Sequence, residues 1–212
     1  MKWSALTKEA REKFLSTYTD DGYSANSVLA DYKQDEELKA KGFDMEDIFY
    51  SGFHCQGDGA CWRGRVDLKK YIMHHWLAPD VAVKREVMLA LLDNDDMTQY
   101  LSIRTQGHYS HSGTMQVNNG IEVYFSKATL IDSPECRDSI FFGACSEDIL
   151  AAIGGEAFLE EVEDEILDAA KELADTIYKA LEAEYEYQHS EECVSELAEA
   201  SDWDFTEEGE ME

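Results

Sequence analysis

Acidic residues outnumber basic ones so strongly that charge repulsion limits what this chain can fold into and bind. The 212 residues include 46 Asp and Glu against 18 Lys and Arg, a formal net charge of −28. Such a charge opposes compaction and repels nucleic acids and anionic membranes. Hydrophobic residues still make up 44% of the chain, which favours a folded core. We therefore expect a folded protein that binds neither nucleic acid nor membranes directly.

The acids are concentrated toward the C-terminal end. Residues 147–212 contain 24 acidic and 2 basic residues, so the first 146 residues are close to balanced. This shift predicts an α+β core over 1–146 that folds by itself, an acidic helical region over 147–200 and a mobile acidic tail over 201–212. There is no apolar run near 18 residues and no signal-peptide pattern, and five unevenly spaced cysteines favour a reducing cytosol.

Apolar periodicity predicts the elements of the core. Residues 4–18 and 24–40 show helical spacing, and a third helix begins at Pro79. Runs rich in aromatic and β-branched residues predict strands, whereas 68–77 fits either a strand or a helix. The pattern favours a small antiparallel sheet packed with helices; its predicted strands are 46–54, 60–66, 98–105 and 114–125.

A long amphipathic helix is expected after the core. Phe158, Val162, Ile166, Ala170, Ile177, Leu181 and Tyr185 repeat mostly at steps of four, which predicts one buried stripe. The other faces carry the candidate partner-binding carboxylates, which are Glu160, Glu161, Glu163, Asp164, Glu165, Asp168, Glu172 and Asp175.

Two interpretations of these carboxylates remain open, a solvated surface and a mimic of nucleic acid. Residues 156–186 contain 12 acids and 2 bases. At about 1.5 Å of rise per residue they span roughly 46 Å, or about one carboxylate per 4 Å. A DNA strand carries a phosphate about every 3.4 Å. The similarity makes a host protein with a basic surface, such as a nucleic-acid-binding groove, the expected partner.

A glycine-rich stretch between two predicted strands is the second candidate site. Glycine and aspartate tolerate positive φ, which predicts a hairpin turn at Gln56, Gly57, Asp58 and Gly59. A three-residue turn would place Cys55 opposite Cys61. The turn either serves geometry alone or presents a tip to a partner. A phosphate loop is disfavoured because no lysine and serine follow, and zinc because the C-x-x-C spacing is missing.

No motif in the chain indicates a catalytic triad, a cofactor or a metal site. We therefore predict no catalytic residue, no cofactor and no metal. His108 and His111 would point to opposite faces of a strand, which argues against joint ligation. An enzymatic alternative would use His54, Asp58 and His108 around the glycine turn.

The stretch SGFHCQGDGACWRG, residues 51–64, resembles the S-G-F-x-x-Q-G-D-G-A-[CS]-[FW]-x-G stretch of small bacteriophage and prophage proteins, some labelled antitoxin-like. The resemblance implies a phage origin and the cytoplasm of a bacterial host. Together with the charge, it favours a non-enzymatic protein that binds and inhibits a host protein, as an anti-defence or host-takeover factor. The alternatives are a small hydrolase-like enzyme with its site at the turn, and a homo-oligomeric structural protein of the virion.

Overall fold

The computed structural model describes residues 1–18, 24–93, 97–124 and 146–211. These residues form two compact units. We call Asp31–Tyr178 the sheet unit, and Met1–Ala30 together with Lys179–Glu212 the terminal unit. Helices α2 (Asn26–Gln34) and α7 (Glu156–Gln188) each contribute residues to both units. None of the helices in the described part of the chain combines the length and the apolar character that a membrane span requires.

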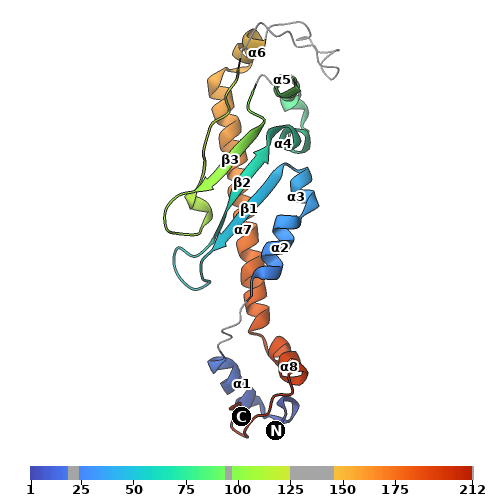
Figure 1. Ribbon diagram of the computed structural model, residues 1–212, viewed down its shortest axis with the longest axis vertical. Helices are drawn as coiled ribbons and strands as arrows, with labels where there is room; N and C mark the ends of the chain where they lie inside the picture. Colours follow the sequence, from blue (N-terminus) through green and yellow to red (C-terminus); the bar gives the residue numbers. More distant parts are fainter. Residues whose placement is uncertain (19–23, 94–96, 125–145, 212) are drawn as a thin grey trace. The chain divides into compact units, whose positions relative to one another are not determined.

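The sheet unit is built on an antiparallel sheet, so the predicted α+β class with a long C-terminal helix is confirmed (Figure 1). Among the described residues the strand order is β1-β2-β3-β4. The bounds are Phe43–Tyr50 for β1, Ala60–Asp67 for β2, Tyr100–Thr105 for β3 and Met115–Val117 for β4. The strand predicted over 114–125 is thus shorter, and its Phe125 lies outside the described residues.

The predicted hairpin between β1 and β2 is present, but the expectation of a three-residue turn is wrong. Tyr50 pairs with Ala60 and Phe49 pairs with Cys61, so Cys55 does not face Cys61. The connection is the longer loop 51–59. The Asp58 carboxylate accepts hydrogen bonds from backbone amides within this loop and stabilises its wider path.

Side-chain caps mark the start of two helices in the sheet unit. Within residues 68–77, ambiguous in sequence, Leu68–His75 form a helix, and the Asp67 carboxylate caps its first turn by accepting from Lys70 N. The predicted helix 24–40 is broken at Asp35, whose carboxylate caps the second piece. The helical segments besides α2 and α7 are α3 (Glu36–Ala40), α4 (Leu68–His75), the 3₁₀ turn η2 (Pro79–Val81), α5 (Ala82–Asp93), the 3₁₀ turn η3 (Ser112–Thr114) and α6 (Ser146–Ile153).

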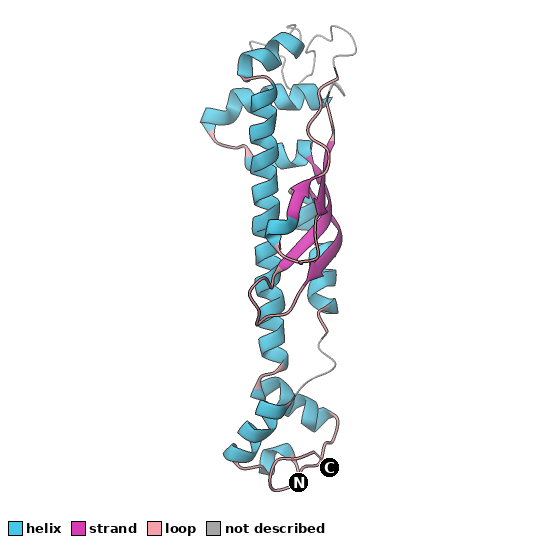
Figure 2. Ribbon diagram, turned by 90° about the vertical axis from the view of Figure 1, so that its left-hand side faces the viewer, coloured by secondary structure: helices cyan, strands magenta, loops and turns pink. Residues whose placement is uncertain are grey.

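Helix α7 forms the second layer of the sheet unit and covers one face of the sheet (Figure 2). Trp62 of β2 is fully buried, and its indole Nε1 donates to the backbone oxygen of Ala170 at 3.0 Å. Ile166 and Ile177 are also fully buried. The sequence pattern placed a boundary at residue 146, but the structure groups most of α7 with the sheet. The reason is that a sheet with one apolar face must bury it against another layer.

An aromatic cluster holds the terminal unit together. The unit contains the 3₁₀ turn η1 (Trp3–Ala5), α1 (Lys8–Thr17) and α8 (Glu191–Ala200). Phe205 is buried, with its ring centroid 5.6 Å from that of Trp3 and 5.3 Å from that of Phe14. The sequence predicted a mobile tail over 201–212. The structure differs at Phe205, because its ring completes this cluster. Glu212 lies outside the described residues.

Removing α7 should therefore unfold the sheet unit. A chain truncated after Cys145 exposes the apolar face around Trp62, so we expect ANS binding and no cooperative thermal transition. A chain truncated after Gln188 keeps α7 and should melt cooperatively. Circular dichroism during heating measures the thermal transition of each truncated chain, and ANS fluorescence measures its exposed apolar surface. A cooperative transition in the shorter chain would show that residues 1–145 form a core without α7.

Candidate functional site

Five carboxylates form one exposed row on α7, which we call the acidic ridge; they belong to Glu161, Asp164, Asp168, Glu172 and Asp175. Steps of three and four residues place them on one side of the helix. All five residues are exposed, whereas the buried stripe lies on the opposite side. Packing against the sheet therefore fixes the direction in which the ridge faces solvent.

The ridge is sparser than a strand of DNA. Its five residues cover about 21 Å at about 1.5 Å of rise per residue, or about one carboxylate per 5 Å. A DNA strand carries a phosphate about every 3.4 Å. The closer agreement expected from the sequence counted acids on every side of the helix. The ridge thus carries charge of the same sign as a nucleic acid, but its carboxylates are spaced more widely than the phosphates of a DNA strand.

Few cations neutralise the ridge. Lys171 lies one turn from Asp168, with Nζ and Oδ1 3.3 Å apart, and Lys84 Nζ of α5 is 3.8 Å from Glu161 Oε2. Asp164, Glu172 and Asp175 form no ion pair with any residue that the structure describes. Both existing pairs are exposed and hence weak. The ridge therefore keeps most of its negative charge for solvent or a partner.

Two of the predicted partner-binding carboxylates, of half-buried Glu163 and exposed Glu165, accept hydrogen bonds from other elements of the sheet unit. Glu165 Oε1 accepts from Trp76 Nε1 at 2.8 Å and from Tyr71 Oη at 3.2 Å. Burial raises the pKa of Tyr71, and the neighbouring Glu165 carboxylate raises it further. Glu163 Oε1 accepts from the backbone amide of Ile121. These bonds attach α7 to α4 and to the chain after β4, so both side chains contribute to stability.

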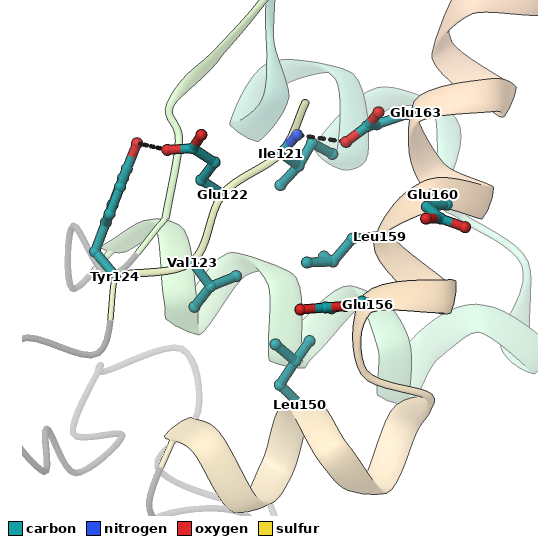
Figure 3. Close-up of a pocket in the computed structure, with 9 residues that line it drawn as sticks. All are labelled: Ile121, Glu122, Val123, Tyr124, Leu150, Glu156, Leu159, Glu160 and Glu163. Carbon is teal, nitrogen blue, oxygen red and sulfur yellow. Dashed lines mark hydrogen bonds between the residues drawn. The ribbon is translucent and has the colours of Figure 1, made fainter. Parts of the chain in front are cut away.

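The last predicted carboxylate, Glu160, lines an open cavity of about 540 Å³ (Figure 3). Carboxylates of Glu122, Glu156 and Glu163 share the lining with apolar groups, among them Leu150 and Leu159. In the part of the chain that the structure describes, no group of three or more acidic, histidine or cysteine residues could hold a metal ion. Carboxylates beside apolar walls suit a lysine or arginine side chain, which has an apolar stem and a charged end.

The glycine turn is held together mainly by Asp58. Its Oδ2 accepts from the backbone amides of His54 at 2.9 Å and Cys55 at 2.6 Å. Gly57 has φ of +104°, a conformation that L side chains rarely adopt. A Cβ at Gly59 would lie 2.6 Å from that of His111. Gln56 is exposed and has no hydrogen bond to a described residue. Gly57, Asp58 and Gly59 therefore determine the shape of the loop, whereas the side chain of Gln56 is available to contact a partner.

The rest of the loop is anchored on the sheet unit by aromatic stacking. The ring of Phe53 lies between those of Tyr50 and Tyr178, with centroids 6.1 and 5.7 Å away. Tyr178 Oη of α7 donates to Gly52 O at 3.2 Å. The Asp58 carboxylate, which the enzymatic alternative would use, is engaged by two backbone amides, and His111 rather than His108 packs against Gly59. His111 itself is structural, because its Nδ1 accepts from Gly113 N.

Substituting Asp58 tests the structural role of the turn. We expect Asp58→Ala to lower the free energy of unfolding by about 1–2 kcal/mol, since hydrogen bonds to charged groups contribute about 1.5–3 kcal/mol and partial exposure reduces this. Gln56→Ala is the matched control and should leave stability unchanged. Urea denaturation measures both. Equal stability of the two variants would mean that the Asp58 hydrogen bonds do not hold the loop.

Comparison with known proteins places the chain in a family but gives it no named activity. No curated protein and no solved structure matches the chain. One family model matches residues 25–191, a segment that contains the whole sheet unit, the glycine turn and the acidic ridge. The chain therefore belongs to the family described as a domain of unknown function, DUF8835.

Proposed function

We propose that this protein is a binding protein that uses the acidic ridge to occupy a basic surface on a partner protein. The observation that carries the proposal is the exposed, mostly unneutralised row of five carboxylates opposite the buried side of α7. Like charges three and four residues apart destabilise a helix by a few tenths of a kcal/mol per pair, about 0.2–0.5. This arrangement of like charges does not stabilise the fold, whereas it favours binding to a basic surface.

The chemistry of the ridge indicates what the partner carries. Carboxylates make short, charge-assisted hydrogen bonds with arginine and lysine. A spacing of about 5 Å along the helix allows separate cationic side chains to meet successive carboxylates. The partner is then a protein whose surface normally attracts anions, such as a nucleic-acid-binding groove. The net charge of −28 argues against nucleic acid as a direct ligand.

The biological setting in this proposal is infection of a bacterium by a phage. It is supported by the resemblance of residues 51–64 to a stretch of phage and prophage proteins. In that setting the protein acts in the host cytoplasm and inhibits a host protein by covering its basic surface, as an anti-defence or host-takeover factor. The sheet unit serves as the rigid support that presents the ridge.

Charge reversal on the ridge tests the proposal. A variant with Asp164, Asp168 and Asp175 changed to Lys keeps the buried stripe and relieves repulsion, so its stability should hold or rise. It should lose proteins that the wild type captures from bacterial lysate, identified by mass spectrometry. Wild-type capture should fall by orders of magnitude between about 50 and about 200 mM salt, as binding dominated by several ionic contacts does.

A matched control makes the same change in charge elsewhere. Glu9, Glu207 and Glu208 of the terminal unit are exposed and form no ion pair with a described residue. Changing these three to Lys should leave capture intact. If the control loses the same proteins as the ridge variant, only net charge matters. If neither variant loses them, the ridge is a solvated surface.

A further inference from the structure

The open cavity beside the first turns of α7 has apolar walls. Leu150 of α6 and Leu159 of α7 are buried and form these walls together with Val123 (Figure 3). The volume of about 540 Å³ lies within the range of about 300–1,000 Å³ that is usual for ligand sites. An apolar group that enters the cavity leaves water, so contact with the walls favours binding.

Carboxylates supply the charge of the described lining. None of the described lining residues is Lys or Arg, and four are glutamates, namely Glu122, Glu156, Glu160 and Glu163. Glu122 Oε2 accepts from Tyr124 Oη at 2.9 Å, and Glu163 Oε1 accepts from Ile121 N. These neutral donors orient the two carboxylates without cancelling their charge. The cavity therefore combines an apolar wall with negative charge that no lining cation offsets within the described chain.

The other two carboxylates of the lining are unpaired within the described chain. Glu156 and Glu160 lie one helical turn apart, and neither carboxylate forms a hydrogen bond or an ion pair with a described residue. Like charges at this spacing repel one another. In Figure 3 the Glu156 side chain projects from α7 into the cavity beside Leu159, and Glu160 lies at its edge. A cation in the cavity would relieve this repulsion.

Apolar walls and unneutralised carboxylates together select an aliphatic chain that ends in a cation. A neutral apolar ligand would take water from the carboxylates without replacing its hydrogen bonds, which costs free energy. In the described chain these carboxylates do not form a group that could hold a metal ion. Lysine and arginine side chains carry an apolar stem and a charged end. The stem fits the walls, and the charged end makes charge-assisted hydrogen bonds with carboxylates.

We propose that this cavity receives one lysine or arginine side chain of the partner protein that covers the acidic ridge. The cavity and the ridge adjoin each other on α7, because Glu160 lies one turn from Asp164 of the ridge. One basic surface can therefore cover both, with one side chain anchored in the cavity. Side chains that fill a pocket in this way tend to dominate the affinity of an interface. The inference rests on the proposed function in one respect, that the ridge binds a basic surface.

Titration with n-butylammonium, which is the lysine side chain without its backbone, tests the cavity directly. In NMR spectra of methyl-labelled protein, n-butylammonium should shift the methyl resonances of Leu150, Leu159 and Val123 at lower concentrations than any other methyl resonances. Two control ligands separate the contributions, because n-butanol has the stem without the charge and methylammonium has the charge without the stem. At equal concentration, each control ligand should produce much smaller shifts of the same resonances.

A cavity variant with Glu156→Gln and Glu160→Gln removes charge and keeps the size of both side chains. Its Kd for n-butylammonium should be about fivefold higher than that of wild type, because two carboxylate partners are lost. It should also capture less of the lysate proteins. The matched control with Glu9→Gln and Glu207→Gln loses the same charge from the terminal unit and should behave as wild type in both measurements. Glu160→Gln alone repeats the test if the cavity variant melts below wild type.

The outcomes separate this inference from the proposed function. Shifts spread along the whole of α7, equal shifts with a control ligand, or an unchanged Kd in the cavity variant overturn the inference. Unchanged capture by the cavity variant overturns it too, because the cavity then takes a free aliphatic amine and not a side chain of the partner. If any of these results appears while charge reversal on the ridge abolishes capture, only the inference fails. If the cavity results are as expected but charge reversal on the ridge leaves capture intact, only the proposed role of the ridge fails.

Discussion

Burial of one side of α7 against the sheet is the constraint on which the other features of the sheet unit depend. Trp62 is enclosed between the two layers and its indole hydrogen-bonds Ala170 O in the middle of the helix. Truncating a buried isoleucine such as Ile166 to alanine costs about 2–5 kcal/mol, which is a large fraction of the stability of a domain. The helix therefore cannot rotate about its axis, and the side opposite Ala170 must face solvent.

This fixed orientation separates the acids of α7 into two groups with different roles. Glu163 and Glu165 accept hydrogen bonds from Ile121 N and from Trp76, so their carboxylates contribute to folding. The acidic ridge lies opposite the stripe and has only two exposed ion pairs. Its repulsion is an uncompensated cost to the helix.

Periodicity predicted what depends on local sequence and missed what depends on distant contacts. The spacing of the apolar stripe predicted α7, and the spacing of the acids places the ridge on the opposite side of the helix. The structural role of Glu165 could not be predicted, because its partner Trp76 is 89 residues away. The wider loop after β1 depends on which amides Asp58 caps, which composition does not specify.

Carboxyl footprinting measures the division of the α7 acids most directly. Carbodiimide coupling of an amine, followed by mass spectrometry, reports the accessibility of each carboxylate. In dilute protein, Asp164, Asp168 and Asp175 should label fast, whereas Glu163, which is half-buried and accepts from Ile121 N, should label slowly. In a complex with a captured partner, the three ridge residues should become protected while Glu163 is unchanged. Equal labelling of Glu163 and the ridge in free protein, or a ridge that stays reactive in the complex, would contradict the account.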